Sequence, residues 1–182
     1  MDDSSESSYR DHEQTASGMR GIGFAVITLS DTRTPADDKS GQLIQQLIHD
    51  AGHVTACYEL VPDDPERIAA ALDDAIADKH VQVIVTNGST GISARDTVIE
   101  IVENFLEKRL DGFGELFRSL SYEEIGAAAM LSRAVAGTLG RRVIFSLPGS
   151  SNAVRLGMTK LILPQVSHLV QELHKDLPGG DG

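Results

Sequence analysis

The sequence predicts an α/β protein built on a mainly parallel sheet. Short apolar segments of strand length alternate with segments whose apolar residues recur at helical spacing. The first apolar segment, Gly23–Leu29, is continuous, as expected of a strand that is buried on both faces of a sheet. Strands that alternate with helices are joined by right-handed crossovers, which place the strands parallel to one another.

The first half of the chain contains three such strand and helix units. We expect strands over Gly23–Leu29, Val54–Leu60 and Val81–Thr86, and helices over Ser40–Asp50, Pro65–Lys79 and Thr97–Arg109. The first helix carries an apolar face that includes Ile44 and Ile48, and Gly52 is placed to end it.

The second half is less regular. We expect short helices over Phe113–Leu120 and Tyr122–Leu131, strands over Ala134–Leu139 and Arg142–Leu147, and closing helices over Asn152–Leu161 and Pro164–Lys175. The two strands fit either a hairpin or two neighbouring sheet strands. The segment from Gly112 to Glu115 fits either a mobile lid or a plain connection between helices.

The length and composition of the chain indicate its domain organisation. The 182 residues are 41% hydrophobic and 24% charged, as in an ordinary globular domain. We expect a flexible acidic tail over residues 1–20, a single α/β domain over residues 21–176 and a frayed end over residues 177–182. Cys57 is the only cysteine and reads as an inert buried thiol. No secretory signal and no membrane-spanning segment is visible, so we expect a cytoplasmic protein.

The charge of the chain limits its partners. A formal net charge of −11 and a pI near 4.8 leave no basic stripe, which argues against binding to nucleic acid or to a membrane surface. A polyanionic small ligand must therefore meet local cations, backbone amides or a metal ion.

Polar residues gather where the predicted strands end. In an open α/β sheet, ligands bind beyond the carboxyl ends of the strands, so these residues mark a site. They lie on four loops: Ser30 and Asp31, Asp63 and Asp64, Gly88 to Gly91, and Pro148 to Ser150.

The glycine loop Gly88-Ser89-Thr90-Gly91 is a candidate phosphate site. Small residues between a buried strand and a helix expose backbone N–H groups to phosphate oxygens. Taken alone, the glycines are better explained by a plain tight turn, and the pattern matches neither a Walker A loop nor a GxGxxG fingerprint.

Two carboxylates are candidate catalytic groups and Mg²⁺ ligands. Asp64 precedes Pro65 and so reads as a helix N-cap, which leaves Asp63 as the functional acid on its loop. Asp96 has three possible roles. It could form a capping box with Ser93, cap the helix that begins at Thr97, or bind Mg²⁺ beside a phosphate group. Arg95 supplies a positive charge beside Asp96. His49 and His53 are four residues apart, but Gly52 interrupts the helix between them, which disfavours a shared metal ion.

These motifs together resemble the molybdenum cofactor biosynthesis B and Mog family (MoaB/MogA). The resemblance runs from Gly21 to Leu173, and the PGS ending favours the B branch. The matching pieces are TLSD at 28–31, DKSG at 38–41, VPDD at 61–64, TNGSTGISARD at 86–96, DGFGELFRSLSYEEIG at 111–126, LSRAVAG at 131–137 and FSLPGSSNAV at 145–154.

The resemblance implies a three-layer α/β/α molybdopterin-binding fold that assembles as a homotrimer or homohexamer. It implies Mg-ATP-dependent adenylylation of molybdopterin, with Asp63 and Asp96 as the catalytic carboxylates and as Mg²⁺ ligands, and with other proteins of the pathway as possible partners. It also implies a substrate pocket that consists of Ser30, Asp31, Ser40, Gly88, Ser89, Thr90, Gly91, Arg95, Pro148, Gly149 and Ser150.

One departure from the family bears on activity. The family loop usually reads TGGTG, whereas this chain has Asn87 and Ser89 there, and Ser89 must tolerate the backbone that the loop requires. Two further hypotheses follow: a member of the family that binds molybdopterin without catalysis, and a nucleotide pyrophosphatase, which rests on shared fold alone.

Overall fold

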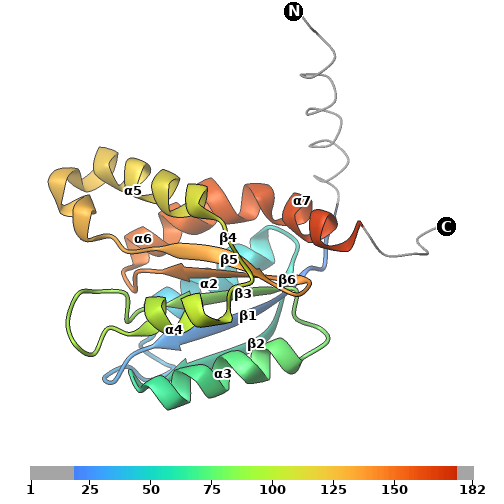
Figure 1. Ribbon diagram of the computed structural model, residues 1–182, viewed down its shortest axis with the longest axis horizontal. Helices are drawn as coiled ribbons and strands as arrows, with labels where there is room; N and C mark the ends of the chain where they lie inside the picture. Colours follow the sequence, from blue (N-terminus) through green and yellow to red (C-terminus); the bar gives the residue numbers. More distant parts are fainter. Residues whose placement is uncertain (1–18, 176–182) are drawn as a thin grey trace, which may run out of the picture.

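The computed structural model describes residues 19–175 (Figure 1). Most of the predicted acidic tail and the whole of the predicted frayed end lie outside these residues. Within them, no helix combines the length and the apolar character needed to cross a bilayer.

The core of the fold is a six-stranded sheet in the order β2-β1-β3-β6-β5-β4. Its strands are β1 (Gly23–Leu29), β2 (Val54–Val61), β3 (Val83–Asn87), β4 (Lys108–Arg109), β5 (Val135–Leu139) and β6 (Arg142–Leu147). The four strands β2, β1, β3 and β6 are parallel, and β5 and β4 add an antiparallel edge. The predicted mainly parallel sheet is confirmed, and β5 and β6 form a hairpin.

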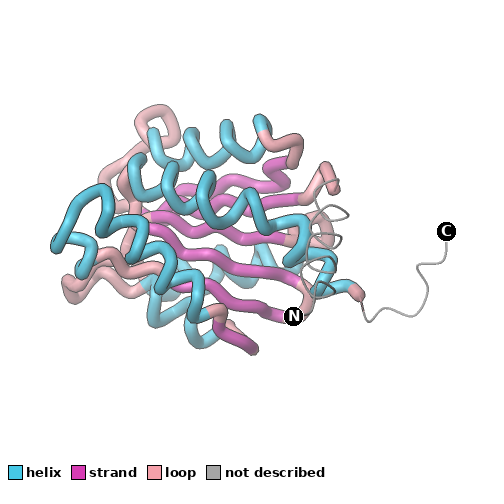
Figure 2. Tube along the Cα trace, turned by 90° about the horizontal axis from the view of Figure 1, so that it is seen from above, coloured by secondary structure: helices cyan, strands magenta, loops and turns pink. Residues whose placement is uncertain are grey.

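Helices cover both faces of the sheet, which gives three layers (Figure 2). One face carries α2 (Lys39–Asp50), α5 (Asp111–Ile125), α6 (Ser151–Gly157) and α7 (Leu163–His174). The other face carries α3 (Pro65–Ala77) and α4 (Val98–Phe105).

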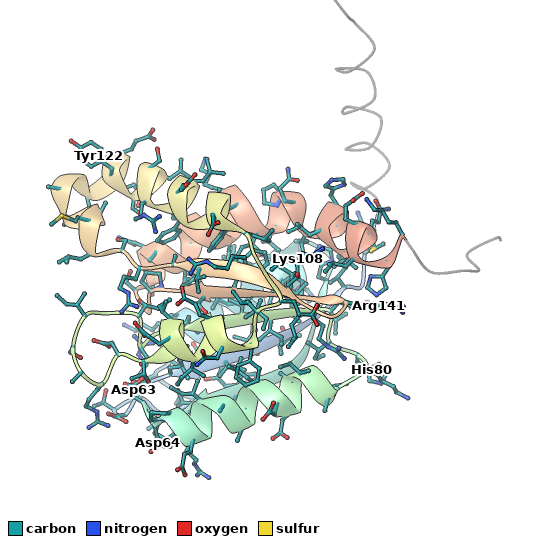
Figure 3. All side chains as sticks on the ribbon, in the orientation of Figure 1. Asp63, Asp64, His80, Lys108, Tyr122 and Arg141 are labelled. Carbon is teal, nitrogen blue, oxygen red and sulfur yellow. The ribbon has the colours of Figure 1, made fainter. Side chains whose placement is uncertain are left out.

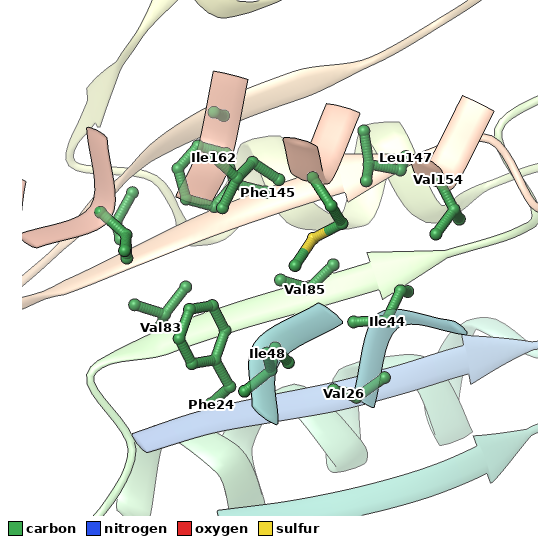
Figure 4. Close-up of a cluster of buried hydrophobic side chains, with 14 of the residues drawn as sticks. Phe24, Val26, Ile44, Ile48, Val83, Val85, Phe145, Leu147, Val154 and Ile162 are labelled. Carbon is green, nitrogen blue, oxygen red and sulfur yellow. The ribbon is translucent and has the colours of Figure 1, made fainter. Parts of the chain in front are cut away.

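Alternate residues of each central strand enter opposite cores. In β1, Phe24 and Val26 pack with α2 on one face, while Ala25 and Ile27 pack with α3 on the other. Figure 4 shows the first of these cores, where Phe24 lies among side chains of β3, β6 and α2. Burial on both faces explains why Gly23–Leu29 reads as a continuous apolar segment.

The structure corrects several predicted elements. The helix predicted over Thr97–Arg109 ends at Phe105, because Leu106 turns to an extended backbone and the chain pairs with the edge of β5 as β4. One helix, α5, and a 3₁₀ segment (Gly126–Leu131) replace the two helices predicted over Phe113–Leu120 and Tyr122–Leu131.

Smaller corrections concern single segments. The segment from Gly112 to Glu115 lies in the first turns of α5, so it is neither a lid nor a connection. A π-helical segment, Met158–Ile162, joins α6 to α7 where a break was expected. Cys57 on β2 is half-buried rather than buried, and burial raises the pKa of its thiol.

Candidate functional site

The four predicted loops meet at one edge of the sheet, which we call the rim. They follow β1, β2, β3 and β6, whose carboxyl ends share this edge because the strands are parallel. Figure 3 shows Asp63 and Asp64 at the rim, whereas His80 and Arg141 lie at the opposite end of the sheet. The Asp63 N–H donates to Asp31 Oδ1 at 3.0 Å, which joins the loops after β2 and β1.

Close packing of glycines shapes the centre of the rim. Gly88 has a φ of +104°, and a Cβ there would lie 2.3 Å from the carbonyl oxygen of Leu29. Gly149 packs against it, because a Cβ on Gly149 would lie 3.1 Å from the Cα of Gly88. Glycine at these positions lets the two loops approach each other closely.

Ser89 adopts a backbone conformation that favours glycine. Its φ is +53°, in the left-handed region, and no other non-glycine residue among residues 19–175 has a positive φ. Within the same residues, the N–H groups of Ser89 and Thr90 have no protein acceptor. The substitution at position 89 is therefore compatible with a phosphate-binding loop. Asn87 below it is buried and donates to Thr28 Oγ1 at 2.8 Å.

Asp63 is the acid on its loop that has no structural duty. As predicted, Asp64 caps α3 by accepting from the Arg67 N–H at 3.0 Å. Asp63 Oδ1 is buried and has no hydrogen-bond partner in the part of the chain described. Burial raises the pKa of Asp63 above its ordinary value; the Ser89 side chain lowers it in part, and the nearby charges of Asp31 and Asp96 raise it.

Asp96 is held in the ionised state by its own loop. It accepts from the Ser93 hydroxyl at 2.5 Å and from the Ser93 N–H at 2.9 Å, and these hydrogen bonds lower its pKa. The contacts resemble one arm of the predicted capping box, but they close a turn, because α4 begins only at Val98. The cap position belongs to Thr97, whose side chain makes no cap bond, so Asp96 does not cap α4.

Arg95 lies across the mouth of the rim. Its side chain is 71% exposed, and Nη2 lies 2.6 Å from Asp31 Oδ2. This ion pair joins the loop after β3 to the loop after β1. A guanidinium this exposed can exchange its carboxylate partner for a ligand phosphate.

A buried carboxylate supports the rim from below, and the DKSG motif at 38–41 that contains it gave no role for its side chain. Asp38, the N-cap of α2, is fully buried and accepts from the Gly41 N–H at 3.0 Å and from the Tyr58 hydroxyl at 2.8 Å. Burial alone would raise the pKa of Asp38, but these bonds and those from Thr28 and Ser40 lower it below its ordinary value. Burial and the neighbouring Asp38 raise the pKa of Tyr58 to about 12.

The remaining predicted residues have local bonding roles that the structure makes visible. Ser40 is buried, and its Oγ donates to Asp38 and accepts from Arg33. Ser30 accepts from the Arg33 N–H at 3.3 Å, and Ser150 caps α6 by accepting from the Ala153 N–H at 3.2 Å. Pro148, like Gly149, is partly exposed at the rim.

Among residues 19–175, no cluster of three His, Cys, Asp or Glu side chains could hold a metal ion by itself. His49 is exposed, and His53 packs on Phe24, where burial lowers its pKa. Mg²⁺ usually takes one or two carboxylates together with phosphate oxygens. Asp63, whose buried Oδ1 has no hydrogen-bond partner among residues 19–175, and Asp96 are the carboxylates of the rim that could contact a Mg²⁺ ion carried by a phosphorylated ligand.

Comparisons with known proteins identify the family of the chain. Residues 25–168 match the family model described as "Probable molybdopterin binding domain". The molybdenum cofactor biosynthesis protein B of Bacillus cereus is 54% identical over 151 residues, which cover 82% of this chain and 89% of the relative.

Solved structures show the same likeness. A crystal structure of a molybdenum cofactor biosynthesis protein B is 52% identical, covers 86% of this chain and 98% of its own, and has a TM-score of 0.84. The tungsten cofactor synthesizing protein MoaB from Pyrococcus furiosus is 40% identical, covers 86% and 99% of the two chains, and has a TM-score of 0.77. The chain therefore belongs to the molybdopterin-binding domain family of the molybdenum cofactor biosynthesis proteins, among relatives of the B type.

Proposed function

We propose that the protein acts in molybdenum cofactor biosynthesis by transferring an adenylyl group from Mg-ATP to molybdopterin. A terminal phosphate oxygen of molybdopterin attacks the α-phosphorus of ATP, the bond to the β-phosphate oxygen breaks, and pyrophosphate leaves. The observation that carries the proposal is the position of two carboxylates, Asp63 with its unpartnered oxygen and Asp96, beside a glycine loop in which the N–H groups of Ser89 and Thr90 have no acceptor within residues 19–175.

The rim offers what this reaction demands. Phosphoryl-type transfer depends on in-line positioning and on neutralising charge more than on covalent help from the protein. The amides of Ser89 and Thr90 would hold the molybdopterin phosphate, and Arg95 would leave Asp31 to meet it. Mg²⁺ bound by Asp63 and Asp96 would neutralise charge on the nucleotide phosphates.

The remaining residues of the pocket either contact the ligand or hold the residues that contact it. We assign Ser30, Asp31, Gly88, Gly91, Pro148, Gly149 and Ser150 to the surface that meets the ligand. Ser40 is assigned to support, because its buried hydroxyl is occupied by Arg33 and Asp38. The single Cys57 is consistent with work in the reducing cytoplasm.

The test is direct. Purified protein is supplied with molybdopterin, Mg²⁺ and ATP, and the adenylylated pterin and pyrophosphate are measured. Formation of both in equal amounts supports the proposal. Molybdopterin binding without product would favour a non-catalytic member of the family, and ATP hydrolysis without molybdopterin would favour a pyrophosphatase.

We also propose that the protein assembles as a homotrimer or homohexamer through the outer face of α5 and the 3₁₀ segment. Large apolar side chains are exposed there: Leu116, Tyr122, Ile125, Met130 and Leu131. Figure 3 shows Tyr122 on the outer side of this layer. An exposed apolar patch of this kind is typical of a subunit contact. Met130→Glu should reduce the mass measured by light scattering to that of a monomer, and an unchanged mass would contradict this interface.

A further inference from the structure

Two arginines beside the rim make the same unusual contact. Arg33, in the loop after β1, donates from Nη2 to the carbonyl oxygen of Gly149 at 3.0 Å. Arg133, just before β5, donates from Nη1 to the carbonyl oxygen of Gly91 at 2.9 Å. Each guanidinium therefore holds the backbone of a glycine in a different loop of the candidate site.

The other half of each guanidinium is fixed by a carboxylate. Arg33 Nη1 lies 3.3 Å from the fully buried Asp38 and 2.6 Å from Ser40 Oγ. Arg133 Nη2 is bonded to the carboxylate of Glu100 on α4. Their side chains are 32% and 30% exposed, against 71% for Arg95, so most of their donor capacity faces protein.

These contacts set the direction of two amides. In a trans peptide the C=O and the following N–H point in opposite directions. Because the Gly91 carbonyl points to Arg133, the N–H of Ile92 points away from that guanidinium. The N–H of Ser150 points away from Arg33 for the same reason. In the described part of the chain, neither N–H has a protein acceptor.

We propose that Arg33 and Arg133 are positioning residues that orient the loops at Gly149 and Gly91, so that the amides of Ser150 and Ile92 are presented to an anionic ligand. Neither arginine is itself a phosphate ligand. The proposal rests on the anion site proposed above, and it assigns the direct cationic role to Arg95 alone among these three arginines.

Substitution by lysine distinguishes an arginine that holds a loop from an arginine that binds phosphate through its charge. As a point charge, lysine binds phosphate well, but it has no planar fork to join a carboxylate and a carbonyl at once. If the arginines act as clamps, Arg33→Lys and Arg133→Lys behave like the matching alanine variants. If they act as charges, the lysine variants stay close to the wild type. Arg141→Lys, at the opposite end of the sheet, serves as the control.

The experiment combines hydrogen exchange with binding of inorganic pyrophosphate. Relative to residues 23–29 of β1, we expect Arg33→Lys to speed exchange in residues 148–152, and Arg133→Lys in residues 88–97. Each increase should be about tenfold, as for the loss of a charged hydrogen bond, with a similar loss of pyrophosphate affinity. Lysine variants that keep wild-type exchange and affinity would overturn the proposal.

The two readouts keep separate claims apart. Hydrogen exchange is measured without ligand, so it decides whether the arginines hold the loops. Wild-type protein that fails to bind pyrophosphate would instead count against the anion site of the proposed function. If hydrogen exchange in the loops rises while the affinity for pyrophosphate is unchanged, the claim that these arginines present the amides to an anion is wrong.

Discussion

Gly88 imposes the most severe steric requirement at the rim. Its φ of +104° is a conformation that L side chains rarely adopt, and a Cβ would lie 2.3 Å from the Leu29 carbonyl oxygen. Backbone strain of this kind costs of order 1–3 kcal/mol. Collision with the backbone of a central strand adds roughly 1–3 kcal/mol. We expect Gly88→Ala to lower the free energy of unfolding by about 2–6 kcal/mol, which corresponds to a fall in Tm of roughly 4–24 °C.

Urea denaturation followed by circular dichroism measures this change. Gly112→Ala is the matched control, because Gly112 lies in the first turn of α5 with no atom within 4 Å of the added Cβ. That variant should keep or gain stability, by up to about 1 kcal/mol. A Gly88→Ala protein as stable as the wild type would refute the steric reasoning for the whole loop.

Three further predictions concern the carboxylates. Because the pKa of Asp38 is lowered in the folded protein, its charge stabilises the fold above 3.8, and this contribution disappears as the pH falls through the lowered pKa. Asp38→Asn should therefore be less stable than the wild type at pH 7, and their urea midpoints should converge in acid; a constant difference would contradict this. The raised pKa of Asp63 means that burial disfavours its charge, so Asp63→Asn should melt higher near neutral pH, and a lower Tm would contradict this. In Gly91→Ala the new Cβ would lie 2.5 Å from Asp96 Oδ2 and would displace that carboxylate. Turnover should therefore fall at least about tenfold, while the free energy of unfolding changes by less than about 2 kcal/mol. Normal turnover would remove Asp96 from the mechanism.

Much of the fold was predictable because local and tertiary signals agree. Gly23–Leu29 and Arg142–Leu147 were predicted with the observed bounds, since each is a buried strand with turn residues on both sides. The misses lie where tertiary contacts decide. Lys108 and Arg109 are polar and exposed, and they form a strand only because they pair with Thr138 and Gly137 on the edge of β5.

The site was predictable to a different extent. Parallel strands with loops at one edge were enough to bring Asp63, Asp96 and the glycine loop together, and the proline after Asp64 identified that residue as a cap. The positions of the arginines were not predictable in this way. Arg33 and Gly149 are 116 residues apart, and no local pattern marks a side chain that binds a distant carbonyl.

The central claim is that two carboxylates beside a glycine loop carry adenylyl transfer. Its most direct test is the rate of adenylyl-molybdopterin and pyrophosphate formation from molybdopterin and Mg-ATP by the wild type, Asp63→Asn and Asp96→Asn, with Asp64→Asn as the matched control. The account predicts product from the wild type and from Asp64→Asn, and none from the other two variants, all of them folded. Folded, ligand-saturated wild-type protein that forms no adenylyl-molybdopterin would contradict it.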